Sequence, residues 1–509
     1  MKVGIDLGTT FSLITQMGYG GGVIFIPDIT YRQNLFTPSL VNFNDEIALV
    51  GLLAENYLEH HPDKSAIRFF KRNFGETKPL FFDHKGTPWY PETIGALVLK
   101  KLKYDAEGFA SELLDGAVIT IPAHFSDPQR KSVMNAAFMA DIPVLGLIEE
   151  PVAAALHYGI SENTLNKLIL VYDFGGGTFD VTLLSMDEKG VYVLAKDGLT
   201  EMGGKEFDER VGEIILNQYW HHFGKSNEPD AKFLLNLRKI SEQIKIELSM
   251  PGVKYVKKMC LLGNKPFEVY ISTEEFENSI KAYVEYTIEI MIRCLKGASV
   301  AVGDVDSVIM VGGSSMVPLI KKRITELFNK DKQKVLFHNP MKAVAGGAAM
   351  HVCQLGGIAD KFKIPPELKG VCGYNLGIRS IDSVSGRIKI DTIINKNTPL
   401  PVTACKTYYT THPMQEKMLL DFVQFIDKTT NPVSLGNMVI SLMHGVSKNY
   451  AIEVTVEYTI NGTVNVRAFD PNSGKELIQS FGNSGKESNF LYTQKALVNS
   501  ISINNLIQS

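Results

Sequence analysis

Residues 168–180 read LILVYDFGGGTFD, and this stretch decides the fold that we expect for the chain. The apolar run up to Tyr172 is typical of a buried strand. Three glycines then let the backbone adopt positive φ and bring its N–H groups close to an anion. The carboxylate of Asp173 at the strand end can hold a hydrated divalent cation, and the Thr178 hydroxyl can reach a phosphate oxygen. A plain glycine-rich hairpin is the alternative interpretation.

A second stretch, at the start of the chain, follows the same plan. Residues 4–10 read GIDLGTT, so that a strand again leads through an aspartate to glycine and threonine. Two such turns in one chain indicate that a phosphate is held from two sides by two similar halves. A third strand–glycine turn, residues 308–315, stands at the start of a predicted helix.

Length, charge and cysteine usage limit the class of protein. The chain has 509 residues, enough for two or three domains, with 45% hydrophobic and 21% charged residues. A net charge of -3 argues against nucleic-acid and anionic-membrane partners. The five scattered cysteines lack metal-ligand spacing and predict reduced thiols. A strand directly after Met1 and the absence of a long apolar run predict a cytoplasmic protein without signal peptide or membrane span.

A change of pattern near residue 358 divides the chain. Pro365 and Pro366 interrupt the helices and strands that precede them, which favours a linker. Beyond it, short alternating segments predict antiparallel strands, most clearly on either side of Asn461-Gly462, a strong hairpin signal. We therefore expect an α/β domain at 1–357, a linker at 358–370, a small antiparallel β domain at 371–482, and a polar tail at 483–509 that forms at most a short helix.

Five motifs occur in one order along the chain, at 4–10, 121–130, 150–155, 173–180 and 311–314. Together they resemble the DnaK-type chaperones of the heat shock protein 70 family. The resemblance is dense over residues 1–355 and looser over 371–482. It implies an actin/hexokinase-like ATPase domain of two similar lobes, followed by a β-sandwich that binds peptides. It also implies ATP or ADP, Mg²⁺ and K⁺ as cofactors.

The resemblance gives roles to several charged residues. On their own, Lys71 and Arg72 would suit a solvated helix face, and Glu149 with Glu150 the first turn of a helix. By resemblance, Lys71 orients the attacking water and offsets transition-state charge, and Glu150 lies on the other side of that water. Such roles suit phosphoryl transfer to water, which depends on positioning and electrostatics.

The nucleotide site that the resemblance implies has three parts. Asp6 and Asp173 would hold Mg²⁺ through water, and Asp180 with Asp6 would place monovalent cations. The phosphates would be held by Gly8, Thr9, Thr10, Phe11, Gly175, Gly176, Gly177 and Thr178. The nucleoside would lie beside Gly203, Gly204, Glu242, Lys245, Ser249, Gly312, Gly313, Ser314 and Met316.

The resemblance also covers the β domain and its connection. Pro122 and Arg130 match a relay between the ATPase and peptide-binding domains. Ile390, Thr411 and Met418 fall near the family's peptide groove, which suits an extended hydrophobic segment of an unfolded or partner protein. Ordinary core positions are the alternative interpretation for these three. A nucleotide-exchange factor is a further partner that the family implies.

The chain departs from the family at several positions. Ile246 and Met316 stand where two arginines usually sandwich the adenine, so the cation–π contribution is missing. Met341 replaces an aspartate, and Lys363–Leu368 stands in place of the acidic, leucine-rich linker. We expect no helical lid of family length after the β domain. Gly146 and Glu149 replace an arginine and an asparagine that dock J-domain partners, which predicts weak or no stimulation by a standard J-protein.

Three functions are therefore compared. The first is an ATP-dependent chaperone that hydrolyses ATP and binds exposed peptide segments. The second is a nucleotide-gated scaffold or switch with a dedicated partner. The third is a small-molecule kinase of the same fold, which would need a catalytic carboxylate facing its substrate. The predicted β domain favours the first.

Overall fold

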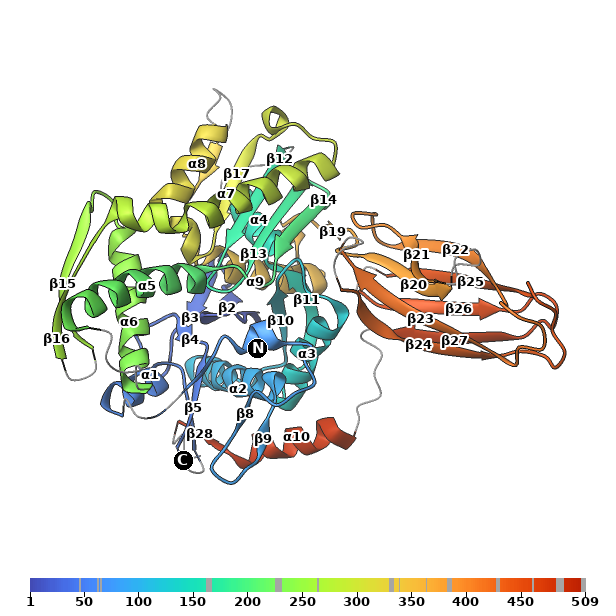
Figure 1. Ribbon diagram of the computed structural model, residues 1–509, viewed down its shortest axis with the longest axis horizontal. Helices are drawn as coiled ribbons and strands as arrows, with labels where there is room; N and C mark the ends of the chain where they lie inside the picture. Colours follow the sequence, from blue (N-terminus) through green and yellow to red (C-terminus); the bar gives the residue numbers. More distant parts are fainter. Residues whose placement is uncertain are drawn as a thin grey trace.

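The computed structural model contains two lobes of similar design and a separate sandwich of strands (Figure 1). It describes residues 1–504 except 45–46, 62–63, 65, 162–166, 225–230, 263–264, 329–333, 338, 363, 382–386, 427–430, 460–461 and 482–488. Within these residues, no helix is both long enough and apolar enough to cross a lipid bilayer.

The sheets of the two lobes have the same strand order. The lobe I sheet runs β11(Val144–Glu149), β10(Gly116–Ile121), β1(Lys2–Asp6), β2(Phe11–Met17) and β3(Val23–Ile26), with β4(Thr37–Pro38) on β2. The lobe II sheet runs β18(Lys334–Leu336), β17(Ser307–Val311), β12(Lys167–Phe174), β13(Phe179–Met186) and β14(Gly190–Leu199). Among the strands named here, the first three of each sheet are parallel and the remaining neighbours are antiparallel. The prediction of two similar halves is confirmed.

Two helices of small residues cross between the lobes. They are α4(Glu150–Ser161) and α9(Ala343–Leu355), and both contribute to a buried cluster shared by the two sheets. A Cβ on Gly347 of α9 would lie 1.7 Å from the carbonyl oxygen of Ala153 in α4. Only glycine allows this close approach, which brings the strand ends of the two lobes to one cleft.

Additional elements surround each sheet. In lobe I these are α1(Leu52–His60), α2(Pro91–Ala110), α3(Asp127–Met139), the sheet β6(Ile47–Val50), β5(Leu40–Asn44), β7(Ile67–Arg68), the 3-10 helix η1(Phe70–Asn73) and the hairpin β8(Phe81–Phe82), β9(Pro88–Trp89). In lobe II they are α5(Gly204–Phe223), α6(Ala231–Leu248), the hairpin β15(Tyr255–Leu262), β16(Lys265–Ser272), α7(Thr273–Gly297), the 3-10 helices η2(Val302–Asp304) and η3(Gly313–Met316), and α8(Pro318–Phe328).

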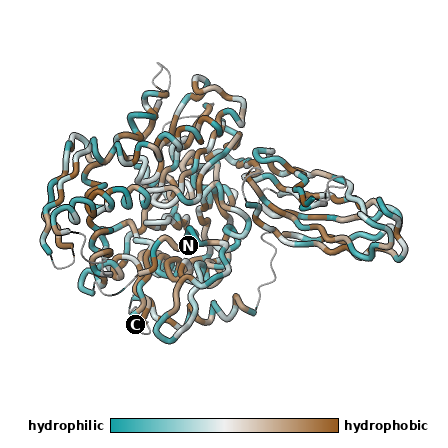
Figure 2. The backbone as a smooth tube through the Cα atoms, in the orientation of Figure 1, coloured by the Kyte–Doolittle hydropathy of each residue, from teal (hydrophilic) through white to brown (hydrophobic). Residues whose placement is uncertain are grey.

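The strands after residue 370 form a sandwich, which we call the β domain. One sheet runs β21(Ile388–Ile394), β20(Asn375–Ile381), β23(Lys417–Phe425) and β24(Val433–Ser441). The other runs β22(Val402–Tyr409), β25(Ala451–Tyr458), β26(Val464–Phe469) and β27(Glu476–Phe481). All neighbours are antiparallel, and alternate side chains meet in one core. The alternation is visible as interleaved brown and teal along these strands (Figure 2). The hairpin β25–β26 has the predicted pairing, although Asn461 of its turn lies outside the described residues.

Two segments outside the predicted domains are structured. Inside the expected linker, η4(Asp360–Phe362) precedes β19(Glu367–Lys369), which pairs with the edge strand β14 of lobe II. Inside the expected tail, α10(Asn489–Ser500) packs on α2 and α3, and β28(Ser502–Ile503) pairs with β6. The tail therefore belongs to the packing of lobe I, as Figure 1 also shows.

Candidate functional site

A cavity of about 450 Å³ lies between the lobes, where the glycine turns of both sheets meet. Most residues predicted for the nucleotide site line it: Asp6, Gly8, Thr9, Thr10, Phe11, Lys71, Glu150, Asp173, Gly175, Gly176, Thr178, Gly204, Glu242, Lys245, Ser249, Gly312, Gly313, Ser314 and Met316. Three predicted residues are not among the lining residues, namely Gly177, Asp180 and Gly203.

The two glycine turns pack directly against each other. A Cβ on Gly176 would lie 1.9 Å from Thr10 Oγ1, and one on Gly177 would lie 2.4 Å from Thr9 Cγ2. Gly203 lies behind them, because a Cβ there would approach the Gly177 nitrogen to 2.4 Å. Gly177 therefore allows the two lobes to approach closely, whereas Gly203 allows close packing within lobe II behind the turn.

The floor of the cavity gathers acidic side chains around one lysine. Lys71 Nζ lies 2.6 Å from Glu150 Oε1, and both side chains are almost completely buried. Asp6 accepts a hydrogen bond of 2.8 Å from Thr120, whereas Asp173 Oδ2 is buried without a hydrogen-bond partner among the described residues.

This arrangement perturbs the carboxylates. Burial raises the pKa of the Glu150 carboxyl to about 7, with Lys71 opposing the shift and Asp6 adding to it. Burial likewise raises the pKa of Asp6. Burial and the neighbouring carboxylates raise the pKa of Asp173 well above its ordinary value. Lys71 alone does not balance the charge of Asp6, Glu150 and Asp173, and a divalent cation would supply the missing positive charge.

The donor set fits a cation held through water. In the described part of the chain, no group of three or more His, Cys, Asp or Glu side chains is arranged to hold a metal ion by itself. Carboxylate oxygens are nevertheless the ligands that Mg²⁺ prefers, and Mg²⁺ usually retains several waters and phosphate oxygens. Asp6 and the unpartnered oxygen of Asp173 are the residues that fit this role.

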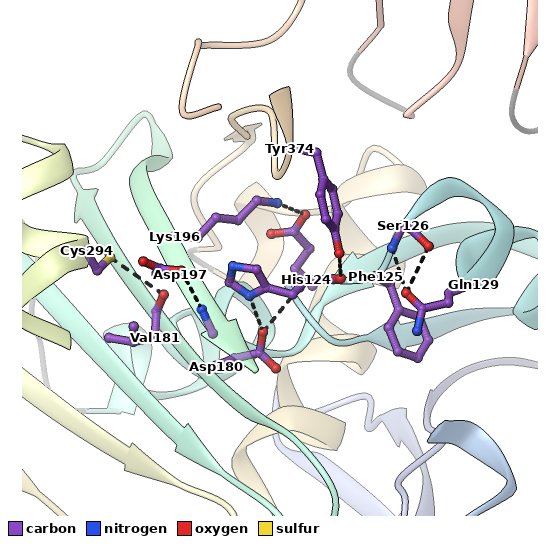
Figure 3. Close-up of polar contacts among 12 residues, drawn as sticks. His124, Phe125, Ser126, Gln129, Asp180, Val181, Lys196, Asp197, Cys294 and Tyr374 are labelled. Carbon is purple, nitrogen blue, oxygen red and sulfur yellow. Dashed lines mark hydrogen bonds and ion pairs between the residues drawn. The ribbon is translucent and has the colours of Figure 1, made fainter. Parts of the chain in front are cut away.

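Asp180 has a different environment from the other carboxylates. Its Oδ1 lies 2.7 Å from His124 Nδ1 and accepts a second hydrogen bond, of 3.2 Å, from the His124 backbone N–H (Figure 3). Both side chains are 2% exposed. Asp180 does not line the cavity and its Oδ1 is engaged by His124, and its role in placing a monovalent cation remains a prediction.

Helix α6 supplies the polar wall further along the cavity. Lys245 Nζ lies 2.7 Å from Asp208 Oδ1 and donates a hydrogen bond of 3.3 Å to the Gly204 carbonyl. The Ser249 hydroxyl donates to the Lys245 carbonyl at 2.8 Å. Glu242 lines the same wall. Asp208 was not predicted from sequence, although its position one turn after the Gly203–Gly204 pair was a usable signal.

An ion pair that joins the two lobes was also not predicted from the sequence. Both guanidinium NH₂ groups of Arg72 bind Glu206, at 2.7 and 2.9 Å, which joins η1 of lobe I to α5 of lobe II. Glu206 Oε2 also accepts a hydrogen bond of 2.7 Å from the Gly203 N–H, so that it caps α5. A bidentate pair of this kind fixes the width of the cavity. The interpretation of Arg72 as a solvated side chain is therefore wrong.

The β domain contacts the ATPase lobes through a polar interface. On the side of the ATPase lobes, Glu149 Oε1 lies 2.8 Å from Arg130 Nη2 and 2.5 Å from Lys196 Nζ, and the Lys196 backbone N–H donates a hydrogen bond of 3.2 Å to Asn397 of the β domain. The Tyr374 hydroxyl donates a hydrogen bond to the His124 carbonyl, as Figure 3 shows. The Asp127 N–H donates to Gln424 of β23 at 3.3 Å.

The predicted relay residues are near this interface. Arg130 also faces Gly462 of the β domain, where a Cβ would lie 3.7 Å from Arg130 Nη1. Pro122 is buried at the end of β10, and its carbonyl accepts a hydrogen bond of 3.2 Å from the Phe125 N–H. A relay through these two residues remains a prediction.

The three residues predicted for a peptide groove occupy different environments. Met418 is buried in the core of the β domain, and Thr411 is exposed in the turn after β22. Ile390 is half-buried on β21, opposite Arg379 of β20. Their role in binding a peptide remains a prediction.

Two lobes with equal strand order that enclose a glycine-lined cavity define an actin/hexokinase-like ATPase fold. The sequence model of the Hsp70 family, described as "Hsp70 protein", matches residues 79–489. The chain therefore belongs to the Hsp70 family. Proteins of this family are ATP-dependent chaperones that bind ATP or ADP with Mg²⁺ and unfolded client peptides. The family model begins to match at residue 79, after the glycine turn 4–10 and after Lys71. The interpretation of these earlier residues therefore depends on their positions in the cavity.

Proposed function

We propose that this chain is a DnaK-type chaperone that hydrolyses ATP in the cleft of residues 1–357 and binds extended hydrophobic peptide segments in the β domain, residues 371–482. The observation that supports the ATPase most strongly is the Lys71–Glu150 pair on the floor of the cavity, below the two glycine turns. A scaffold that does not hydrolyse nucleotide would not need this buried pair.

Each residue of the cleft has a role in this proposal. The turns at Thr9–Thr10 and 175–178 bind the β- and γ-phosphates through backbone N–H groups and threonine hydroxyls. Asp6 and Asp173 would hold Mg²⁺ through water, which offsets phosphate charge when it is bound. Lys71 and Glu150 place the attacking water between them. With a pKa of about 7, Glu150 can accept a proton from that water near neutral pH.

Lys71 also stabilises the negative charge that develops on the transferred phosphoryl group. Its side chain is 2% exposed, so that water screens its charge little. This argument favours hydrolysis over the kinase alternative, because the proposal assigns the described carboxylates of the cavity floor to Mg²⁺ (Asp6 and Asp173) and to water (Glu150), which leaves none of them for an acceptor hydroxyl.

The β domain would bind a peptide mainly through backbone hydrogen bonds, with Ile390, Thr411 and Met418 near the groove. Helix α10, the described helix that follows the β domain, packs on α2 and α3 rather than over the sandwich. We therefore expect bound peptides to exchange rapidly. A nucleotide-exchange factor would be a partner of the ATPase lobes.

We expect little stimulation by a standard J-protein. At this interface Glu149 is engaged by both Arg130 and Lys196. Although burial acts in the opposite direction, these two cations lower the pKa of Glu149, which therefore stays charged. Where many family members present a neutral asparagine to the J-domain, this chain has a charged glutamate that already pairs with Arg130 and Lys196.

The test is ATP hydrolysis by the full chain with and without an unfolded peptide. The proposal predicts slow basal turnover that the peptide increases, and no phosphate transfer to added sugars or polyols. Turnover that requires such an acceptor would favour the kinase, and nucleotide binding without turnover would favour the scaffold.

A further inference from the structure

Lys71 and the phosphate-binding turn at 175–178 belong to different lobes. Lys71 lies on η1, which is fixed to the core of lobe I by the buried rings of Phe70 and Phe74. Its partner Glu150 directly follows β11 of the same lobe, whereas the turn joins β12 to β13 of lobe II. The distance from Lys71 to a phosphate on this turn therefore depends on how the two lobes are held together.

The residue that follows Lys71 joins the lobes at this point. Both NH₂ groups of Arg72 bind Glu206 of lobe II, and the two side chains are only 10% and 15% exposed. The guanidinium also lies against the phosphate-binding turn, because a Cβ on Gly177 would lie 3.0 Å from Arg72 Nε. A bidentate pair that is largely shielded from water fixes both the distance and the relative orientation of its two partners.

Glu206 is in turn connected to the backbone of the phosphate-binding turn. It accepts a hydrogen bond of 2.7 Å from the Gly203 N–H at the start of α5. The first two N–H groups of α5 donate to the carbonyls of Gly175 and Gly176, at 3.0 and 3.1 Å. A continuous series of short polar contacts thus leads from η1 through Glu206 and the start of α5 to the turn.

Lobe II also contacts the residue before η1. Phe69 lines the cavity and has φ of 56° and ψ of 20°, a left-handed conformation that aromatic residues rarely adopt. The centroid of its ring lies 4.8 Å from the guanidinium carbon of Arg238 on α6 and 5.7 Å from Lys205 Nζ on α5. These cation–π contacts stabilise the strained residue. Side chains of lobe II therefore hold η1 on both sides of Lys71.

We infer that Arg72 is a positioning residue for ATP hydrolysis: its pair with Glu206 places Lys71 against the γ-phosphate at 175–178, and does so only while the two lobes are closed. This inference rests on the proposed hydrolysis of ATP in the cleft. Arg72 does not line the cavity, so that it contributes little to nucleotide affinity. It acts on the rate instead, because a misplacement of about 1 Å at a reacting centre can lower a rate about 100-fold.

The experiment measures single-turnover ATP hydrolysis and the dissociation constant of ATP for Arg72→Met in the full chain. Turnover is expected to fall about 10- to 100-fold while the dissociation constant changes less than about threefold. The matched control is Lys239→Met. Lys239 also joins the lobes, by pairing with Glu59, but both side chains are 50% exposed and neither lines the cavity. The control should therefore match the wild type in both measurements. Arg72→Lys keeps the charge without the bidentate geometry and should recover part of the turnover.

A double-mutant cycle with Lys71→Met separates positioning from a general structural effect. If Arg72 acts through Lys71, adding Arg72→Met to Lys71→Met should lower the residual turnover by less than about twofold. An equal loss in both backgrounds would overturn the inference and leave the proposed function intact, as would turnover by Arg72→Met within about twofold of the wild type.

Absence of hydrolysis by the wild type would instead overturn the proposed function on which the inference rests. Circular dichroism melting checks that each variant is folded. If Arg72→Met does not fold, Glu206→Gln takes its place under the same criteria, because glutamine removes the charge but can still cap α5.

Discussion

The replacement Lys71→Met tests the role of the buried lysine. Methionine has a similar length and volume but no charge, so that the packing around residue 71 is largely kept. The variant leaves Glu150 among Asp6, Asp173 and the phosphates without its cation at 2.6 Å. We expect ATP to bind but to be hydrolysed very slowly.

The size of the effect follows from the geometry. Loss of one preorganised charge in a site shielded from water typically costs about 3–4 kcal/mol of transition-state stabilisation, which is a loss of about 10²–10³ in turnover. Breaking a buried ion pair costs about 3–5 kcal/mol of stability when the remaining charge stays ionised. Here burial has already raised the pKa of Glu150 to about 7. Glu150 can take up a proton, and the loss of stability should therefore fall below that range.

The assay is single-turnover ATP hydrolysis, together with ATP titration and thermal unfolding. The matched control is Lys101→Met, which removes another buried lysine, paired with Asp28 at 2.9 Å and with Asp105. Lys101 does not line the cavity. The control should therefore melt earlier yet retain turnover per folded molecule. Turnover by Lys71→Met within about threefold of the wild type would refute the catalytic assignment.

Three further predictions concern pH, the domain interface and the C-terminal segment. The raised pKa of Glu150 means that the folded state binds its proton more tightly, so that this contribution to stability is complete below pH 4.5 and lost as pH rises through about 7. In urea unfolding from pH 5 to 8 without nucleotide, the free energy of unfolding should therefore decline less in Glu150→Gln than in the wild type. An equal decline in the two proteins would contradict the assignment. Tyr374→Phe leaves the buried His124 carbonyl without its donor and should weaken the contact between the β domain and the ATPase lobes by about 1–2 kcal/mol. The variant should therefore be cleaved faster than the wild type by a protease acting between the domains. Identical cleavage rates would argue against this contact. Val498→Ala should destabilise lobe I by about 2 kcal/mol, because Val498 is completely buried there. The control is Val439→Ala, which should change the free energy of unfolding by less than about 0.5 kcal/mol because Val439 is exposed. Equal melting temperatures of the two variants would show that α10 does not stabilise the lobe.

The sequence could predict the parts of the site that have local signals. Residues 168–180 contain both the strand and the turn that carry Asp173 and Thr178, and residues 4–10 repeat the pattern. The structure brings these two turns together, with Gly176 against Thr10. The positive φ expected for the three glycines is wrong, since none of Gly175, Gly176 and Gly177 has it. What requires glycine is the close contact of Gly176 and Gly177 with the first turn, where a Cβ would not fit.

The parts that sequence reasoning missed depend on contacts between distant residues. His124 meets Asp180, and Arg72 meets Glu206, across the gap between lobes. A histidine or an arginine alone does not reveal its partner. The β-strand at 502–503 was equally hidden, since two residues have no periodicity, and its pairing with β6 is recognisable only in the folded chain.

The measurement that tests the central claim most directly is the affinity of the full chain for a fluorescent, extended hydrophobic peptide with and without ATP and Mg²⁺. Fluorescence anisotropy gives both the dissociation constant and the release rate. If the cleft and the β domain act together as a chaperone, ATP should accelerate peptide release and weaken binding, and ADP should do so less. An equal affinity and release rate in the presence and absence of nucleotide, with ATP shown to be bound, would contradict the account.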